Sequence, residues 1–597
     1  MKKLVISHWS LVIVILIIAA FLRLYNLTEV PPGLYHDEAM NGNNALEALS
    51  IGNFKVFYPE NNGREGLFIN IQAIFLAIFG NQSWVLRLPS ALFGILTVLG
   101  IYFLTKELFA GRLFSTGTGR SSAPAAEAAL DLSASEPLAS LRDQSSDASE
   151  TFRTKTGGRL TYPEIIALLS SFFLATSFWH INFSRIGFRA IMAPFFLVWG
   201  IYFLLKSLNS ILWMSDVHRT SDIPKLKIIF FSILAGIFYG LGFYSYIAYR
   251  ATPLLILIIL FLYWLKNKEP QIRKKILLST FYFLLSTIII AAPLGLYFLH
   301  NPQDFFGRTT QISIFNSPTP LKDLSMNILK TAGMFNFIGD WNWRHNYAGR
   351  PELFWPVGIL FILGVVLSIR RLFSTGTGRL RPPAGRSGLD SRQADSDFVG
   401  DQAQPASETF RTKTGGGFFT SVFLLSWLIV AALPVVVSNE ALPHALRSIL
   451  LIPPVFILAG FGGIWLYEKI AEKLQKYTKI PKLLLLSIFY FLLSLFVFEA
   501  YYTYFILWAQ NPNVYGAFNA DYVQISRDLN NLPKELPKYV VVEASGIDVR
   551  GIPMPAQTIM FITDTFSPEK QKEKNIFYIL PSQMNQIPEG SYLITLK

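Results

Sequence analysis

The chain has no cysteine among its 597 residues. Disulfide bonds, thiolate metal sites and cysteine nucleophiles are therefore excluded. Charged residues are also scarce, at 15%, whereas 52% of the residues are hydrophobic and the mean hydropathy is +0.39. A soluble globular protein is more polar, and here the apolar residues gather in blocks of membrane-spanning length. The composition thus indicates an integral membrane protein.

Acidic residues are fewer than basic ones, 39 against 52, and the net charge is +13. The basic residues form short clusters between apolar blocks, as the positive-inside rule expects, and they do not form one basic face. No nucleic-acid partner is therefore expected. The N-terminal stretch has the basic end and apolar core of a signal peptide, but it lacks a small-residue cleavage site. We interpret residues 8–24 as a retained first membrane helix.

Eleven apolar blocks are candidates for membrane-spanning helices. They lie near residues 8–24, 88–105, 164–180, 190–206, 228–247, 251–266, 276–299, 353–369, 418–437, 448–467 and 483–506. One further block, 67–80, would cover roughly 21 Å as a helix, against a hydrocarbon core of about 30 Å. It is too short to cross comfortably.

The charge of the loops decides how 67–80 is interpreted. If this block stays in the interface and the N-terminal lysines are inside, three later basic clusters fall on the cytoplasmic side. Those clusters are 266–275, 370–371 and 468–479. If 67–80 crossed the membrane, all three would move outside. The positive-inside rule therefore favours an amphipathic or re-entrant helix, which makes 25–86 one long extracytoplasmic loop.

The sequence divides into two domains. We expect a transmembrane domain over 1–506 and a small extracytoplasmic domain over 507–597. Within the first, 115–158 and 374–416 share "STGTGR" near one end and "SETFRTKTGG" near the other. Their middles are rich in Ser, Ala, Asp and Gly, and they cannot bury enough apolar surface to fold. We interpret them as low-complexity cytoplasmic insertions, with a pair of docking elements as the alternative.

The C-terminal tail changes character. Its β-branched and aromatic runs predict strands, and one amphipathic segment predicts a helix. The strands are expected at 538–546, 558–565, 575–580 and 591–597, and the helix at 520–532. The fold class is thus an all-α polytopic membrane protein of about eleven transmembrane helices, with amphipathic interfacial helices in the first outer loop and a small C-terminal extracytoplasmic α/β domain.

Ionisable residues close to a membrane are costly to bury and mark a functional cavity by default. The predicted outer side carries Asp37, Glu38, Arg64, Glu65, Arg87, Arg185, Arg189, Arg250, Asp304, Asp340, Glu440, His444 and Arg447. An acidic pair among several arginines fits a transfer reaction on an anionic donor. A carboxylate can take a proton from an acceptor hydroxyl, and arginines can hold a phosphate and stabilise it as it leaves.

Each of these residues also has a purely structural interpretation. Asp37 can N-cap the helix that follows it, with Glu38 favouring the dipole of the first turn. Arg64 and Arg87 can be interfacial anchors whose charged ends reach the head groups. We therefore infer a site only because these residues converge on the predicted outer face of the membrane.

The same holds for the later loops. Arg185 and Arg189 sit in a short outer turn, where solvated caps also fit. His444 and Arg447 lie three residues apart on one helical face, and His444 can equally be a structural contact.

Several segments, taken in order, resemble the C-type polytopic membrane glycosyltransferase superfamily, and are similar to protein O-mannosyltransferases and lipid A aminoarabinose transferases. The matching segments are "FLRLYNLTEVPPGLYHDEAMNGNNALEAL" (21–49), "GREGLFINIQAIFLAIFG" (63–80), "SWVLRLPSALFGILTVLGIYFLTKELFAGR" (83–112), "ALLSSFFLATSFWHINFSRIGFRAIMAPFFLVWGIYFL" (167–204) and "EALPHALRSILLIPP" (440–454).

The resemblance implies transfer of a sugar from a polyprenyl-phosphate carrier to an extracytoplasmic acceptor, usually with inversion of the anomeric centre. By resemblance Asp37 matches the catalytic carboxylate and Glu38 its acidic neighbour. Arg64 stands near the position of the basic residue for the carrier phosphate, and Arg87 matches the arginine of "RLPSA".

Further residues complete the predicted site. We place His444 and Arg447 with Arg64 and Arg87 as donor phosphate ligands. The accessory residues are His36, Glu65, Arg185 and Arg189.

One element departs from the family pattern. Many relatives carry an aspartate a few residues after "SR" in the second outer loop, where this chain has Gly187 and Arg189. A divalent metal is therefore not supported by a second acidic motif. This favours a metal-independent site with a single base, with a divalent metal as the alternative.

The expected partners are the polyprenyl-phosphate sugar donor, an acceptor protein, lipid or glycan, and membrane lipids. The expected location is the plasma (inner) membrane, with the site and the C-terminal domain outside the cytoplasm. The main alternative is a polytopic lipid or polysaccharide transporter or flippase. Internal symmetry and broken helices near mid-membrane are typical of transporters, and neither is clear in this sequence.

Overall fold

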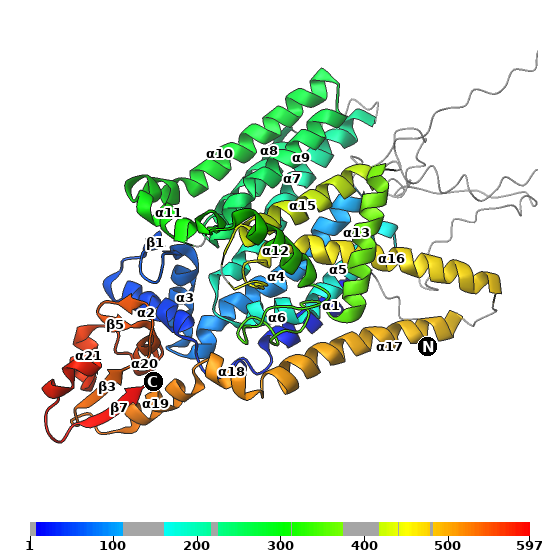
Figure 1. Cartoon of the computed structure of the whole chain (residues 1–597). Coiled ribbons are helices and arrows are strands. Elements are labelled where there is room, and N and C mark those ends of the chain that lie inside the picture. The colour runs from blue at the N-terminus through cyan, green and yellow to red at the C-terminus, as the bar shows by residue number, and fades with distance from the viewer. Residues whose placement is uncertain are drawn as a thin grey trace, which may run out of the picture.

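The computed structural model describes residues 8–110, 160–216, 225–311, 313–373, 417–439, 441–477 and 482–597. The two predicted insertions, 115–158 and 374–416, lie outside the described residues. Figure 1 shows a bundle of long helices with a smaller mixed domain packed against one end. The protein is an integral multi-pass membrane protein.

Nine helices of the described part are long and apolar enough to span a membrane. They are built on α4 (Ser83–Ala110), α7 (Met192–Asp216), α8 (Lys225–Gly242), α9 (Pro253–Lys266), α10 (Pro270–His300), α13 (Trp355–Phe373), α15 (Gly417–Val436), α16 (Ile452–Tyr477) and α17 (Lys482–Tyr501). Short 3₁₀ turns precede three of these helices: η2 (Arg189–Ile191), η3 (Ile247–Ala251) and η5 (Ile449–Leu451). The π-helix η6 (Tyr502–Trp508) continues α17.

Two more predicted spans differ from a straight long helix. The block near 164–180 is divided into α5 (Tyr162–Ala175) and α6 (Phe178–Arg185), which meet at an angle of 58°. The Ser177 hydroxyl accepts a hydrogen bond from the His180 amide, which caps the start of α6. The first block forms α1 (His8–Leu24), which has 17 described residues. Each of the eleven predicted blocks is therefore helical.

The segment predicted to be the first outer loop contains two helices and a small hairpin. These are α2 (His36–Ile51), β1 (Phe57–Tyr58), β2 (Arg64–Glu65) and α3 (Gly66–Phe79). The strands pair antiparallel, with Phe57 opposite Glu65. At 14 residues, α3 covers roughly 21 Å and is too short to cross a bilayer, as predicted. Later segments that are also predicted to lie on the outer side form α11 (Pro302–Gln311), η4 (Ile314–Asn316) and α12 (Pro320–Gly333).

The C-terminal domain is a small α/β unit. Its parallel sheet has the order β6-β3-β7, and a two-stranded antiparallel ribbon, β4-β5, lies beside the first outer loop. The elements are α18 (Pro512–Ala517), α19 (Ala520–Asn531), β3 (Lys538–Val542), β4 (Asp548–Val549), β5 (Ile552–Pro553), η7 (Met554–Ala556), α20 (Gln557–Thr563), α21 (Pro568–Lys574), β6 (Ile576–Ile579), η8 (Pro581–Gln586) and β7 (Tyr592–Leu596).

One predicted strand of this domain is wrong. Residues 558–565 form most of α20 and its C-terminal cap instead. The helix packs against α2 and α19, and its Ile559, Met560 and Phe561 are buried. This tertiary burial outweighs the β-propensity of the run, which is a weak preference of the isolated segment.

The C-terminal domain binds α2 through hydrogen bonds and ion pairs. The Arg550 guanidinium donates to both carboxylate oxygens of Glu47, at 2.7 and 2.9 Å, and to Glu60, at 2.8 Å. Deeper in the interface, Asn43 donates to the Gln557 side chain at 2.8 Å. The domain thereby fixes the helix whose first turn contains the predicted catalytic acid (Figure 1).

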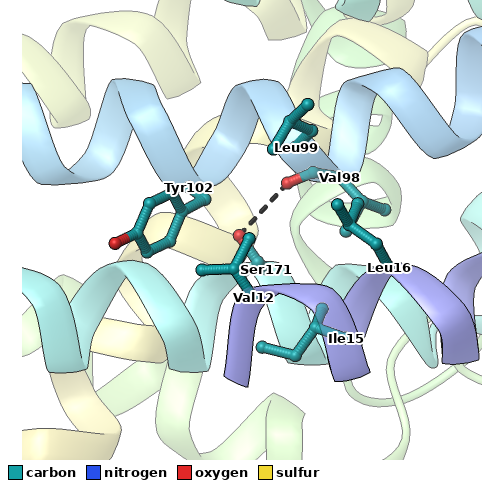
Figure 2. Close-up of a pocket in the computed structure, with 7 residues that line it drawn as sticks. All are labelled: Val12, Ile15, Leu16, Val98, Leu99, Tyr102 and Ser171. Carbon is teal, nitrogen blue, oxygen red and sulfur yellow. Dashed lines mark hydrogen bonds between the residues drawn. The ribbon is translucent and has the colours of Figure 1, made fainter. Parts of the chain in front are cut away.

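Small residues let the membrane helices approach closely. Figure 2 shows the apolar contact of α1, α4 and α5, where Ser171 donates to the Val98 carbonyl oxygen at 3.1 Å. Where α13 crosses α16, a Cβ added at Gly364 would lie 2.0 Å from the Leu458 carbonyl oxygen. Small residues at such crossings are typical of membrane helix packing.

We therefore expect Gly364→Ala to loosen the crossing of α13 and α16, because the added methyl group meets a backbone oxygen that cannot move away alone. Overpacking of this kind costs about 1–3 kcal/mol. The measurement is the thermal unfolding midpoint of the purified protein in detergent. Gly295→Ala in α10 is the matched control, because nothing lies within 4 Å of its added Cβ. Equal midpoints for the two variants would contradict the close crossing.

Candidate active site

The site is built around the start of α2. The helix begins at His36, so Asp37 and Glu38 stand in its first turn, where negative charge is favoured by the helix dipole. Neighbouring side chains on a helix point about 100° apart, since there are 3.6 residues per turn. Glu38 consequently points into the protein and is fully buried, whereas Asp37 is partly exposed.

Glu38 forms a buried ion pair with Arg87 of α4. The guanidinium donates from Nε to Oε1 and from Nη2 to Oε2, both at 3.2 Å. The remaining Arg87 donors bind the carbonyl oxygens of Pro31 and Gly33, both at 2.7 Å. Glu38 also accepts from the Gly187 amide at 2.5 Å. The pair thus joins the first outer loop, α4 and the loop after α6.

Asp37 has a different environment. Its Oδ1 accepts a hydrogen bond from Nδ2 of the Asn61 side chain at 2.7 Å, and the Tyr35 hydroxyl also faces the carboxylate. Asn61 has a left-handed backbone, with φ of 53°, in the turn between β1 and β2, a conformation that asparagine tolerates. Within the described ranges Asp37 forms no ion pair. It is therefore a carboxylate with accepting capacity left over.

Arg64 is almost fully buried, and the charge of Asp37 acts on it. Its Nη1 donates to the Asn41 side-chain oxygen at 2.8 Å and its Nη2 to that of Asn44 at 2.5 Å. Burial and the nearby charge of Arg189 lower the pKa of Arg64 to about 10, so the group stays cationic at neutral pH. It supplies positive charge to the site while its donors are held by the protein.

Two partly exposed arginines flank Glu65. Arg189 donates from Nε to Glu65 Oε2 at 2.9 Å, and Arg250 Nη2 lies 3.8 Å from Oε1. The Arg250 guanidinium also stacks on Phe305, with its carbon 4.3 Å from the ring centroid. Two cations share one carboxylate, so the group has net positive charge.

A further arginine comes from the loop between α12 and α13. The guanidinium carbon of Arg344 lies 4.0 Å from the centre of the Tyr35 ring. Its Nε is buried and has no hydrogen-bond partner in the described part of the chain. The next residue to Tyr35, His36, has its pKa lowered mainly by burial, so it is neutral at neutral pH. The charges of Asp37 and Arg344 both act on Tyr35 and His36, and the charge of Asp37 also acts on Arg64.

The same loop contains an aspartate–histidine cluster. Asp340 Oδ2 lies 3.0 Å from His345 Nδ1 and 3.7 Å from His444 Nδ1. Burial opposes ionisation of Asp340, but the hydrogen bond and charge of His345 outweigh it and lower the pKa of Asp340. Burial, followed by the charge of His345, holds the pKa of His444 well below its usual range.

The structure brings some predicted residues together and separates others. Asp37, Glu38, His36, Arg64, Glu65, Arg87 and Arg189 lie in one group around α2 and β2. Of the predicted phosphate ligands, Arg87 is fully buried and its donors are occupied, so in this arrangement it cannot reach a donor. Arg185 is also buried, with its guanidinium donating to carbonyl oxygens of Leu22, Asn26 and Val30.

His444 and Arg447 lie in the later loop, apart from the Asp37 group. Arg447 donates to the Ser438 hydroxyl, and His444 contacts the Asp340 cluster. Arg344 is the residue that relates this cluster to Asp37, because its charge acts on both His36 and His444.

Sequence reasoning missed Tyr35, Asn61, Arg344 and His345. Tyr35 and Asn61 are neutral, and no motif or charge pattern in the sequence marked them as site residues. Arg344 and His345 stand in "WNWRHNY", 341–347, where an adjacent basic pair among aromatic residues was a usable signal.

A sequence model of the dolichyl-phosphate-mannose-protein mannosyltransferase family matches residues 67–116. The resemblance is confirmed over this segment. It covers all but the start of α3 and the whole of α4, including Arg87. No curated protein sequence matches the chain significantly.

Solved structures with a similar arrangement were found. The Archaeoglobus fulgidus oligosaccharyltransferase in the apo form is 13% identical, with a TM-score of 0.43, and the match covers 94% of this chain and 64% of that one. ArnT from Cupriavidus metallidurans, bound to undecaprenyl phosphate, is 11% identical, with a TM-score of 0.44 and coverage of 98% and 88%. The S. cerevisiae Pmt1–Pmt2 complex, bound to the sugar donor, is 17% identical, with a TM-score of 0.31 and coverage of 51% and 35%. The chain spans less than two thirds of the length of the archaeal enzyme.

We expect Glu38→Ala to destabilise the protein by about 3–5 kcal/mol, because it leaves the Arg87 charge buried without its partner. The measurements are the thermal unfolding midpoint and the folded fraction in size-exclusion chromatography. Lys206→Met is the control, since it breaks the partly exposed pair with Glu107 and should cost about 0–1 kcal/mol. A Glu38→Ala midpoint equal to that of the control would show that the ion pair of Glu38 and Arg87 does not stabilise the fold.

Proposed function

We propose that this protein is a membrane glycosyltransferase that moves a sugar from a polyprenyl-phosphate carrier to an acceptor hydroxyl outside the cytoplasm, with Asp37 as general base. The observation that carries the proposal is the contrast between two adjacent acids. Glu38 is buried and paired with Arg87, whereas Asp37 is partly exposed and forms no ion pair among the described residues. The charge of Asp37 acts on Arg64, and Arg344 lies over the ring of the nearby Tyr35.

The reaction follows from that contrast. Asp37 takes the proton of the acceptor hydroxyl while the acceptor oxygen forms a bond to the anomeric carbon. The bond between that carbon and the phosphate oxygen breaks, and the polyprenyl phosphate leaves with the electron pair. A single displacement of this kind inverts the anomeric centre. No protein nucleophile is needed, which agrees with a site built around a single available carboxylate.

Arginines stabilise the leaving phosphate. Arg344 lies over the ring of Tyr35, and Arg189 and Arg250 flank Glu65. All three arginines are partly exposed, so their guanidinium groups can meet an anion without breaking the fold. The buried Arg64 adds further positive charge near Asp37. The donors of Arg87 are engaged with Glu38, and it acts as a positioning residue in this mechanism. Such preorganised charges act where negative charge develops during the reaction.

The donor class is supported by the match to the dolichyl-phosphate-mannose-protein mannosyltransferase family. A lipid-linked donor also suits the position of the acid. Asp37 follows α1 by a short loop, so a phosphate anchored by its lipid tail emerges close to it, and the acceptor can approach from the aqueous side.

We expect Asp37→Asn to lower the transfer rate by about 10²–10⁴-fold, because the amide cannot accept the proton, while the fold and carrier binding are retained. The assay follows release of labelled sugar from a polyprenyl-phosphate donor by protein in lipid nanodiscs, without any gradient, and native mass spectrometry follows binding of polyprenyl phosphate. Asp304→Asn, another outer acid that accepts from the Tyr297 hydroxyl, is the matched control. Donor turnover that survives Asp37→Asn would overturn the general-base role. A wild type that binds the carrier but transfers nothing would favour a flippase.

We expect Arg344→Gln to lower kcat on the order of 10²-fold, because the leaving phosphate loses a charge-assisted donor, and Arg344→Lys to recover part of the rate. Arg350→Gln changes an arginine of the same loop that pairs with Glu499, and it should stay close to wild type. Steady-state kinetics with the same donor measures the three variants. Equal rates for Arg344→Gln and Arg350→Gln would remove Arg344 from the mechanism.

A further inference from the structure

Asp340, His345 and His444 form a cluster that the proposed transfer reaction does not use. Each offers one ligand atom, and these atoms all lie within 4.8 Å of one another. Asp340 and His345 come from the loop between α12 and α13, and His444 from the loop between α15 and α16. The cluster therefore joins two segments that are about a hundred residues apart in the chain.

The spacing of these atoms suits a bound cation. Zn²⁺ bonds of about 2.0–2.1 Å in a tetrahedral site place neighbouring ligand atoms about 3.3 Å apart. The Asp340 carboxylate oxygen Oδ2 lies 3.0 Å from Nδ1 of His345 and 3.7 Å from Nδ1 of His444. Shifts of a few tenths of an ångström would bring these two contacts to the expected spacing, and the nitrogens of the two histidines lie within 4.8 Å of each other.

The carboxylate is held in position by the backbone of both loops. Asp340 Oδ1 accepts from the Asn342 amide at 2.8 Å, and Oδ2 accepts from the Ala445 amide at 2.9 Å. The Ala445 carbonyl oxygen in turn accepts from the Trp179 indole at 3.1 Å. Oriented ligands of this kind are typical of metal sites, where surrounding hydrogen bonds fix the coordinating groups.

An unsatisfied atom lies inside the cluster. Nδ1 of His444 is buried and has no hydrogen-bond partner within the described ranges. Its ring stacks on that of His345, with centroids 4.9 Å apart and planes inclined by 27°. A buried polar atom without a partner is costly, and a cation would satisfy its lone pair.

We propose that Asp340, His345 and His444 bind a divalent cation of the Zn²⁺ class. Two imidazole nitrogens with one carboxylate oxygen suit Zn²⁺, whereas Mg²⁺ and Ca²⁺ prefer oxygen ligands. A fourth ligand, such as water, would complete the coordination. This cation is separate from the predicted metal-independent chemistry at Asp37, and the proposal does not depend on the proposed function.

The cation would act as a clasp between the two loops. His345 directly follows Arg344, so fixing His345 to the later loop also fixes the backbone that places Arg344 over the Tyr35 ring. Loss of the cation is therefore expected to loosen the rim of the site.

The test uses full-length protein purified without a polyhistidine tag, because such a tag would bind the same metals. Zn²⁺ is added, the excess is removed by dialysis, and the metal per chain is measured by mass spectrometry of the elements. We expect about one retained equivalent in the wild type. His345→Gln and His444→Gln should each reduce retention at least tenfold, whereas His300→Gln, an exposed histidine, should match the wild type.

A second measurement does not depend on the variants being folded. Wild-type protein titrated with Co²⁺ should develop the visible absorption of a tetrahedral nitrogen–oxygen site, and added Zn²⁺ should abolish it. No retained Zn²⁺ and no Co²⁺ spectrum would overturn the proposal and leave a hydrogen-bonded cluster. Retention that is equal in wild type and in the double variant of His345 and His444 would overturn it too, by placing the metal elsewhere.

Discussion

The buried ion pair of Glu38 and Arg87 is the interaction on which the site depends. Two charges taken out of water are costly unless every donor and acceptor is matched. Here the match is made by backbone groups of the first outer loop, by α4 and by the Gly187 amide after α6. The pair therefore holds only when these three segments are assembled. The first turn of α2, with Asp37 on it, is placed as a consequence.

This arrangement divides the charged residues by depth. The inner ones are Glu38, Arg87 and Arg185, whose charged groups bond to other parts of the fold, although Nε of Arg185 has no partner in the described part of the chain. The outer ones, Asp37 and Arg189 among them, keep part of their surface and their bonding capacity. Under the proposed function, the buried charged residues therefore position the site, whereas partly exposed residues of the same types take part in the reaction. In the proposed mechanism, two adjacent acids on one helix turn take opposite roles because the helix points them in different directions.

Support for this site comes from distant parts of the chain. The C-terminal domain binds the outside of α2 through Arg550, and the loop after α12 brings Arg344 to the Tyr35 ring. The Asp340 cluster ties that loop to the segment containing His444. A small number of polar contacts therefore sets the shape of a rim built mostly from loops, whereas the apolar helices below form a scaffold of close crossings.

The sequence alone determined the membrane scaffold, because apolar blocks of spanning length and the charge of the loops depend only on local composition. It also pointed to the start of α2, since an acidic pair directly after a membrane helix is visible in the order of residues. Only the tertiary structure decided which charges are free. Whether Arg64, Arg87 or Arg344 has N–H donors available for a ligand depends on partners that lie far away in the sequence. Arg87, for example, donates to the carbonyl oxygen of Pro31, which is 56 residues earlier in the chain. The helix at 557–563 shows the same limit, because burial against α2, which no local preference encodes, outweighs its β-branched residues.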